Sequence, residues 1–334
     1  MRLSMSGSGV SSSGTLLLAA VTALFGQTGT APPLALVQTI PLTGVNGRID
    51  HLAVDVDRNR LFVAALGNNT VEVIDLRQGT VLRSLAGFRE PQGIANAVTA
   101  IAVANGGSGA VDWIDPQSLE KARTLVVGGD ADNVRYDAGA KRIYVGYGSG
   151  AIAALDPATG RKLAEASVGG HPESFQLERT GGRMFVNVPD AGKIAVIDRA
   201  TLKLSANWPV TGASSNYPMA LDDEGHRLFV GCRRPAKVLI YDTQSGKITS
   251  VADIVGDTDD LFYDVARARL YVIGGEGFVD VFQARSGASL ARMARLPTVA
   301  GARTGLFVPG SQRLFVAVPR RGGQSAEIRV FEAR

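Results

Sequence analysis

The chain has a single cysteine, Cys232, among its 334 residues. No disulfide can therefore form within one chain, and no cysteine near the N-terminus is available for lipid attachment. Nothing in the sequence identifies a base that would activate this thiol as a nucleophile, so we interpret Cys232 as a structural residue. An oxidising compartment would impose no covalent cross-link on the fold.

Aromatic residues are also scarce, at 6% of the chain, and the sequence contains no run of basic residues. The net charge is +4, with acidic and basic residues interspersed. Nucleic-acid binding needs a concentrated basic stripe, which this chain lacks. We therefore expect a mildly basic soluble surface and no nucleic-acid partner.

Long apolar runs are missing, with one short exception near the N-terminus. The stretch "TLLLAAVTALFG" (Thr15 to Gly26) follows a basic residue, Arg2, and precedes small residues. It is too short to span a bilayer as a helix, and its pattern is typical of an export signal. We predict that residues 1–31 are a signal peptide and that the protein is periplasmic or secreted, with no stable membrane insertion after signal removal; an uncleaved anchor is the alternative.

What the sequence does contain is a repeated quartet. "RLFV" occurs at Arg60, Arg227 and Arg313, and close variants occur at Arg142, Arg183 and Arg269. The gaps between these arginines are 82, 41, 44, 42 and 44 residues, so one copy is missing from the double gap. "AIAV" (Ala100 to Val103) fills it, because it precedes the acid of "VDWID" by the same interval that separates "RLFV" from "VEVID". The chain therefore carries seven repeats.

Each repeat predicts four short strands, which we call A to D, with "RLFV" as strand B and "VEVID" as strand C. Alternating apolar residues favour strands, and Gly, Pro, Asp and Asn mark the turns between them. Four strands recurring at this period are typical of a β-propeller blade. The last repeat ends after its strand C, and "LALVQTIPL" (Leu34 to Leu42) has no repeat of its own. We predict that residues 34–334 form one all-β, seven-bladed propeller, closed by the N-terminal strand in the last blade.

The repeats resemble those of the bacterial YVTN-repeat β-propellers. The nearest matches to the family tetrad are "YVGYG" at Tyr144, "FVNV" at Phe185 and "IAVAN" at Ile101. The resemblance covers nearly all of the chain after the predicted signal and implies an exported bacterial propeller. Similar propellers include lactonases, streptogramin-type lyases and subunits of quinoprotein dehydrogenases. The tetrad marks architecture, so the resemblance assigns no catalytic residue.

The residues just before each strand A vary on a framework that otherwise repeats. In a propeller these D–A connections, together with the B–C loops, surround one mouth of the central channel. Aligning the seven tetrapeptides from "RIDH" to "ARTG" gives a third position that is polar or amphipathic throughout: Asp50, Gln92, Asp132, Glu173, Tyr217, Asp259 and Thr304. The opposite face has ordinary turn chemistry, including the third histidine, His226. Each acid alone is more often a turn former, but their convergence on one mouth favours a function.

We therefore predict a ligand site at this mouth. Its expected polar residues are Asp50, His51, Asp132, Asn133, His171, Glu173, Asp259 and Asp260, and the expected counter-charges are Arg233, Arg234 and Arg303. The carboxylates suit Ca²⁺ or Mg²⁺, whereas the arginines suit an anionic group on a ligand. Three functions stay open: binding of a small polar molecule or protein segment, metal-dependent hydrolysis or elimination of the lactonase kind, and a purely structural role. We expect a monomer.

The export signal gives the first testable prediction. The mature chain should begin between Gln27 and Pro32 and should lie outside the cytoplasm. N-terminal sequencing of protein from the native host checks this, and material that still begins at Met1 would contradict cleavage. Reducing agent should leave the stability of the monomer nearly unchanged, because one cysteine cannot form an internal bridge.

Overall fold

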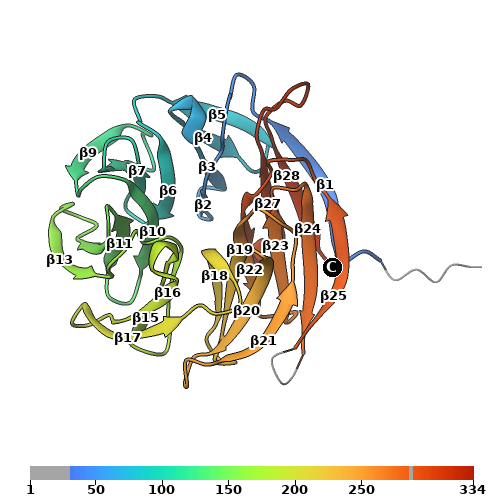
Figure 1. Ribbon diagram of the computed structural model, residues 1–334. Coiled ribbons are helices and arrows are strands. Elements are labelled where there is room, and N and C mark those ends of the chain that lie inside the picture. Colours follow the sequence, from blue (N-terminus) through green and yellow to red (C-terminus); the bar gives the residue numbers. More distant parts are fainter. Residues whose placement is uncertain (1–30, 286–288) are drawn as a thin grey trace, which may run out of the picture. The chain divides into compact units, whose positions relative to one another are not determined.

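A computed structural model describes residues 31–285 and 289–334, and Pro32–Arg334 form one compact unit. The predicted signal peptide lies outside the described residues, apart from Ala31. The compact unit is a ring of seven four-stranded antiparallel sheets, as the repeats predicted (Figure 1). The part of the chain described by the structure has no helix with the length and apolar character needed to cross a lipid bilayer.

The strands recur in the predicted order, and blades 1 to 7 follow the chain. The strands A line the centre of the ring: β2 (Leu52–Asp55), β6 (Pro91–Asn96), β10 (Ala131–Asp137), β14 (Phe175–Leu177), β18 (Ser214–Asp222), β22 (Thr258–Asp264) and β26 (Thr304–Val308). The strands B carry the quartet: β3 (Arg60–Ala65), β7 (Ile101–Asn105), β11 (Arg142–Tyr147), β15 (Arg183–Val188), β19 (Arg227–Arg234), β23 (Arg269–Gly274) and β27 (Arg313–Val318).

The strands C and D complete each blade toward the rim. The strands C are β4 (Thr70–Asp75), β8 (Ala110–Ile114), β12 (Ala151–Leu155), β16 (Lys193–Asp198), β20 (Ala236–Asp242), β24 (Phe278–Ala284) and β28 (Glu327–Ala333). The strands D are β5 (Thr80–Leu85), β9 (Lys121–Val126), β13 (Lys162–Ser167), β17 (Lys203–Pro209), β21 (Ile248–Asp253), β25 (Leu290–Pro297) and, for blade 7, β1 (Leu34–Pro41). Three short 3₁₀ turns lie between strands: η1 (Leu66–Asn68) and η2 (Pro189–Ala191) occupy B–C loops, and η3 (Pro309–Ser311) occupies the A–B turn of blade 7.

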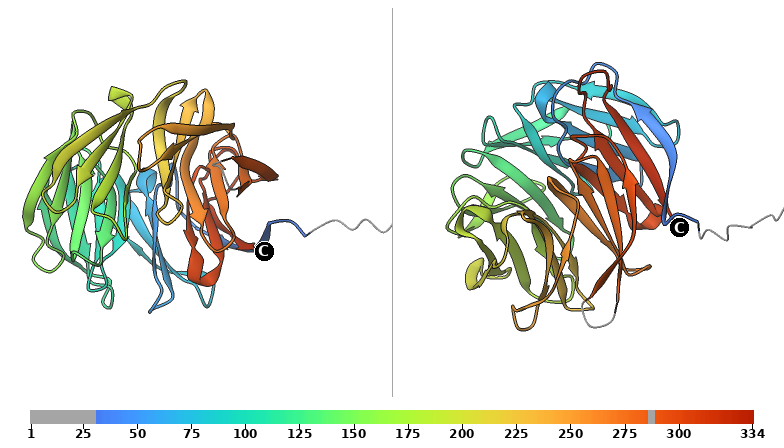
Figure 2. Two further views of the ribbon diagram at one scale, coloured as in Figure 1. Left: turned by 90° about the horizontal axis from the view of Figure 1, so that it is seen from below. Right: turned by 45° about the vertical axis from the view of Figure 1, so that its right-hand side comes forward.

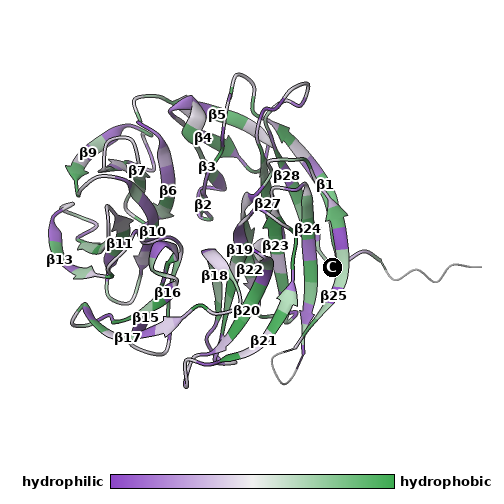
Figure 3. Ribbon diagram, viewed as in Figure 1, coloured by the Kyte–Doolittle hydropathy of each residue, from purple (hydrophilic) through white to green (hydrophobic). Residues whose placement is uncertain are grey.

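Burial on both faces explains why strand B is a continuous run of apolar residues in the sequence. The blades stand face to face, so a middle strand has a neighbouring blade on both sides (Figure 2). In β3, Leu61, Phe62 and Val63 are all fully buried, whereas the rim strand β5 is largely exposed. A strand buried on both faces has no polar side to alternate with. Figure 3 accordingly shows apolar colour along the middle strands, such as β20 and β23, whereas the innermost strands carry polar segments as well.

The hydrophobic core is divided into seven clusters, one between each pair of adjacent blades of the described chain. The cluster between blades 7 and 1 contains Ile40 and Leu42 together with Phe315, Ile328 and Val330. The ring therefore has no single centre of packing, and each interface depends on both of its blades.

The recurring arginine joins neighbouring blades. Arg60 donates to the carbonyl of Pro116 at 2.6 Å, and Arg183 donates to the carbonyl of Thr243 at 2.5 Å. Both acceptors lie in the C–D turn of the following blade. Arg183 also pairs with Glu178, an acid of its own A–B turn. Arg183 thus pairs with an acid of its own blade and also donates a hydrogen bond to the next blade.

The N-terminal strand closes the ring as predicted. Strand β1 pairs antiparallel with β28 from Leu34 opposite Ala333 to Pro41 opposite Glu327. The two ends of the sequence lie side by side in Figure 1, where blue β1 borders red β28. Leu34, Ile40 and Leu42 are buried by this closure.

Deleting residues 34–42 should expose the edge of β28 and remove these three buried side chains. We expect the loss to be about 5 kcal/mol or more of unfolding free energy, at roughly 1.5–3 kcal/mol for each fully buried aliphatic side chain, together with aggregation through the open edge. Thermal melting and size-exclusion chromatography check this. A chain that begins at Pro32 is the matched control. A deleted protein that stays monomeric with an unchanged Tm would refute the closing role of β1.

Candidate functional site

The mouth residues sit where the strands A leave regular pairing. The ladder between strands A and B shifts register between Pro91 and Ile94 in blade 2 and between Ala131 and Val134 in blade 3. Blades 5 and 6 have equivalent shifts, at Tyr217 and Asp259. A bulge of this kind bends a strand and re-aims its side chains, and bulges are common beside functional sites.

The strand pairing identifies the equivalent residue in every blade. The valine of the quartet in strand B pairs with one residue of strand A, and the equivalent residue lies two positions before that partner. This ring consists of Asp50, Gln92, Asp132, Glu173, Tyr217, Asp259 and Arg303. The sequence alignment had the same members except the last, where it was wrong by one residue. Thr304 is buried and donates to the carbonyl of Ile49, so Arg303 is the seventh member of the ring.

Close packing of the innermost strands leaves room for only one side chain in the bulge of blade 2. Gly93 follows Gln92 there, and a Cβ on Gly93 would lie 2.2 Å from the carbonyl oxygen of Asp132. Only glycine lets strand β6 approach β10 this closely. The two mouth side chains Gln92 and Asp132 are therefore brought together by a residue that contributes no side chain.

Six of the eleven predicted site residues line one polar cavity of about 260 Å³ at the mouth. They are Asp132, His171, Glu173, Arg233, Asp259 and Arg303. The cavity has four further lining residues, Arg48, Gln92, Asp130 and Tyr217, all of which belong to the aligned tetrapeptides. An adjoining cavity of about 590 Å³ shares Asp130, His171, Glu173 and Tyr217 and opens toward the B–C loops of blades 3 and 4.

One side of the cavity is an arginine cluster around Asp259. Arg233 donates from Nη2 to Asp259 Oδ1 at 2.5 Å, and its guanidinium lies over Tyr217 at 4.1 Å from the ring centre. Arg303 places Nε 2.9 Å from Asp259 Oδ2, an ion pair whose angle is outside hydrogen-bond geometry. Burial nevertheless raises the pKa of Asp259 to about 6, against the opposing effect of the arginines. Arg233 and Arg303 thus lie at ion-pair distance from Asp259, and their role as counter-charges to a ligand site stays a prediction.

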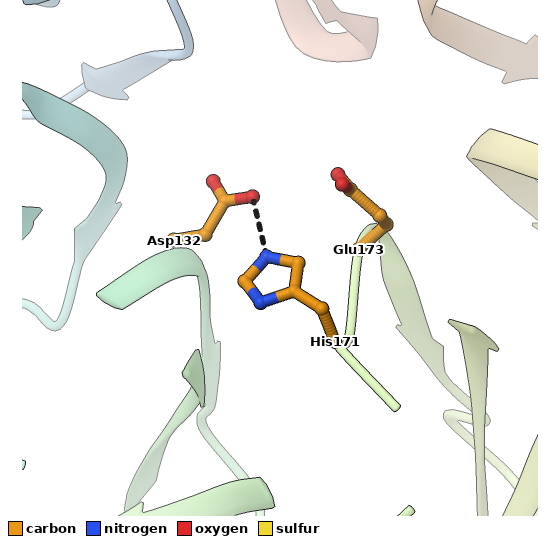
Figure 4. Close-up of side chains that lie close together, drawn as sticks. All are labelled: Asp132, His171 and Glu173. Carbon is orange, nitrogen blue, oxygen red and sulfur yellow. Dashed lines mark ion pairs between the residues drawn. The ribbon is translucent and has the colours of Figure 1, made fainter. Parts of the chain in front are cut away.

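The other side holds Asp132, His171 and Glu173, which reach into a common space from two neighbouring blades (Figure 4). One potential ligand atom from each lies within 4.8 Å of the others. His171 Nδ1 is 2.7 Å from the carbonyl oxygen of Gly148, so it donates there. Nε2 then faces Asp132 Oδ2 at 3.8 Å, an ion-pair distance. A backbone carbonyl that orients imidazole in this way is the usual second partner of a metal-binding histidine.

The pKa values of His171 and Glu173 on this side of the cavity are both raised well above their ordinary values. Interaction with Asp132 raises the pKa of His171 to about 9, in spite of partial burial. Burial, reinforced by the nearby charges of Asp132 and Asp259, raises the pKa of Glu173 to about 8. Glu173 therefore holds a proton near neutral pH unless a cation takes the place of that proton.

Below the mouth, the channel contains a second group built on His51. His51 Nδ1 lies 3.3 Å from Asp260 Oδ2, and its Nε2 lies 3.9 Å from Asp50 Oδ1. Burial opposes the charge on His51, but the two acids outweigh it and raise the pKa of His51 to about 10. Asp50 is 1% exposed and accepts a bond from Arg48 at 3.0 Å, which links this group to the mouth. Burial raises the pKa of Asp50.

Five predicted residues lie outside these two cavities. His51 and Asp260 line a third cavity in the channel. Asp50 lines none of the three, although it contacts Arg48 and His51. Asn133 is buried beside Asp132, and its Oδ1 has no hydrogen-bond partner among the described residues. Arg234 is exposed and follows Arg233 out of the mouth.

Arg135 was not found by the sequence reasoning. It lies in strand β10 and lines a channel cavity of about 350 Å³ together with His51 and Asp260. The sequence feature that could have revealed Arg135 is its charge at a position seven residues before the quartet arginine. In other blades this position has an uncharged residue: Ala53, Gln176, Ala220, Phe262 and Leu306.

Three comparisons place the chain among known proteins. A family model described as outer membrane protein assembly factor BamB (PQQ_2) matches residues 41–196, slightly less than half of the chain. No curated protein matches the sequence. The chain is thus similar to this family over blades 1 to 4, and the YVTN-repeat resemblance stays a prediction.

Two solved structures share the fold. The hydrazine synthase of Kuenenia stuttgartiensis superposes with a TM-score of 0.73 at 17% identity, over 83% of this chain and 95% of that one. A chain in a mitotic checkpoint complex superposes with a TM-score of 0.76 at 13% identity, over 96% of this chain and 98% of that one. At these identities the likeness shows the fold alone.

The raised pKa values predict that stability falls as pH rises. A group with a higher pKa in the folded than in the unfolded chain binds its proton more tightly when folded, so deprotonation favours unfolding. Glu173 contributes to this loss of stability between pH 4.5, its ordinary pKa, and about pH 8, its pKa in the folded protein. His171 contributes from 6.5 to about 9, and His51 from 6.5 to about 10. We therefore expect the free energy of unfolding to fall between pH 5 and pH 9.

Urea denaturation in the presence of EDTA measures this fall. Glu173→Gln should make it smaller, because the variant has no proton to lose at this site. Asp57→Asn, in an exposed A–B turn, is the matched control and should behave like the parent protein. Stability that is constant or rises over this range would refute the crowding of charge at the mouth.

Proposed function

We propose that the protein is an exported propeller that binds a small polar ligand at the mouth of its central channel. The observation that carries this proposal is the ring of seven equivalent positions, which hold five different residue types and of which six line one cavity. Packing between blades requires similar residues, so the variety of polar residues in this ring points to a separate task. Loops and bulges on a rigid scaffold are the usual place for such a task.

The charges suggest which kind of ligand fits. Arg233 and Arg303 are held by Asp259. Among the described residues, Asp132 has only His171 at ion-pair distance, and Glu173 has no ion-pair partner. A ligand with a cationic or hydrogen-bond-donating end fits the side of Asp132 and Glu173. Its acceptor groups fit the N–H groups of the arginines that the protein does not use, since each guanidinium carries five N–H donors in all. A purely structural mouth is disfavoured, because the ion pairs leave an open polar cavity.

Asp132→Asn tests this function. A thermal-shift panel of amino acids, sugar acids and lactones should contain compounds that raise the Tm of the parent protein but not that of the variant. The Tm of the unliganded variant should be equal or higher, since the change relieves repulsion between carboxylates. Phe62→Ala is the contrasting variant and should cost about 3–5 kcal/mol as a buried aromatic. A panel without any effect, or effects that persist in Asp132→Asn, would contradict the proposal.

A second candidate function, a metal-dependent hydrolase or lyase, is favoured by Asp132, His171 and Glu173. A divalent ion between them would replace the proton of Glu173 and take Nε2 of the oriented imidazole. The sequence suggested Ca²⁺ or Mg²⁺, but a donor set with imidazole suits Zn²⁺ or Mn²⁺ better than Ca²⁺. Such an ion would polarise a carbonyl group or lower the pKa of a bound water.

Titration calorimetry with Zn²⁺, Mn²⁺ and Ca²⁺ on EDTA-treated protein separates the two candidates. Metal dependence predicts binding of Zn²⁺ or Mn²⁺ that weakens at least tenfold in both His171→Ala and Glu173→Gln and is retained in Asp57→Asn. Absence of binding, or binding unaffected by the two changes, would eliminate the metal-dependent function and leave simple ligand binding.

A further inference from the structure

The channel below the mouth has a second ring of equivalent residues, each paired with the third residue of the quartet in strand B. Its members are Ala53, Ala95, Arg135, Gln176, Ala220, Phe262 and Leu306. All except Ala220 line the channel cavity of about 350 Å³. Arg135 is the one charged member of a ring that is otherwise small, apolar or neutral.

Arg135 uses little of its hydrogen-bonding capacity within the protein. Nη1 donates to the carbonyl of Val134 at 2.9 Å, and the guanidinium lies 5.6 Å from the ring centre of Phe175. Among the described residues no carboxylate oxygen lies within ion-pair distance of it, whereas Arg233 and Arg303 at the mouth are both paired. Burial lowers the pKa of Arg135, and the more distant charges of Asp260 and Asp132 only partly offset this. A desolvated guanidinium without a counter-ion favours an anion from outside the chain.

The walls around Arg135 suit an apolar group. Val54, Ile94, Phe262 and Leu306 line the same cavity, and His51 and Asp260 occupy its end toward the mouth. A small organic acid fits this combination, with its carboxylate on the guanidinium and its carbon chain against the apolar side chains. Arginine and carboxylate form paired, parallel hydrogen bonds, which a point charge cannot provide.

The opposite face gives access to Arg135. A cavity of about 870 Å³ lies there, between the A–B turns of blades 3 and 4, and it shares Arg135, Tyr136 and Gln176 with the channel cavity. Its lining has four arginines against two acids: Arg135, Arg142, Arg179 and Arg199, with Asp137 and Glu178. An excess of positive charge in a concave surface attracts anions. The turn residues of this face had predicted only ordinary turns.

We propose that Arg135 anchors a binding site in the channel for a small carboxylate with an apolar chain, entered from the face of the A–B turns. The site uses none of the residues that line the mouth cavity and goes beyond the ligand proposed there. Its ligand is monoanionic, because one unpaired guanidinium faces the cavity, and it is short, because the space is limited.

Binding of hexanoate, compared with uncharged hexanamide, tests the site by calorimetry or by ligand-observed NMR. We expect the parent protein to prefer hexanoate at least tenfold and Arg135→Leu to lose that preference. Arg135→Lys should give an intermediate affinity, since an ammonium group keeps the charge but not the paired geometry. Arg161→Leu, an exposed change in the same blade, is the matched control and should bind as the parent does.

Folding of the variants is checked by circular dichroism and Tm, and if Arg135→Leu does not fold, Arg135→Lys and Arg135→Gln carry the comparison. Hexanoate bound no better than hexanamide, or equally well after loss of the guanidinium, would overturn the proposal. Asp132→Asn and Glu173→Gln should leave hexanoate binding unchanged, so failure at the mouth and failure in the channel are distinguishable.

Discussion

Strand β1 completes blade 7 by pairing with β28, and the closed ring that results holds every other feature in place. Each of the seven core clusters lies between two blades, so a ring opened at one interface weakens the packing of the blades on both sides. The channel exists only while the innermost strands surround a common axis. Residues from blades 1, 3, 4, 6 and 7 meet at the mouth, and some of them, such as Asp50 and Asp259, are more than two hundred residues apart in the sequence.

Closure makes it possible to keep unfavourable charge near the axis. Asp50, Glu173 and Asp259 are buried or nearly so, and burial raises the pKa of each. In a flexible chain such carboxylates would separate and become hydrated. The blades prevent this separation, so the carboxylates stay close together and repel one another. A cation, a proton or a donor group of a ligand would relieve that repulsion when it binds. This is the physical basis of a preorganised polar site.

The two ends of the channel differ in charge. The mouth combines acids, arginines and His171, whereas the opposite end has more arginines than acids around Arg135. Between them, His51 and Asp260 lie 3.3 Å apart and line the channel cavity together with apolar side chains. One scaffold therefore offers two chemically distinct environments, and loss of one need not alter the other.

The sequence by itself determined the seven blades, the four strands of each and the closing strand, because "RLFV" and its variants recur at a fixed period and the first strand has no repeat of its own. It also indicated the mouth, because variable polar residues interrupt a regular framework. It did not determine which residues meet. Arg303 takes the ring position expected of Thr304. The ring position depends on which residues of strands A and B pair, and an alignment of the sequence alone does not reveal a shift of one residue in that pairing. Arg135 and the raised pKa values of His51 and Glu173 depend on burial and on charges from other blades, and only the tertiary structure decides these.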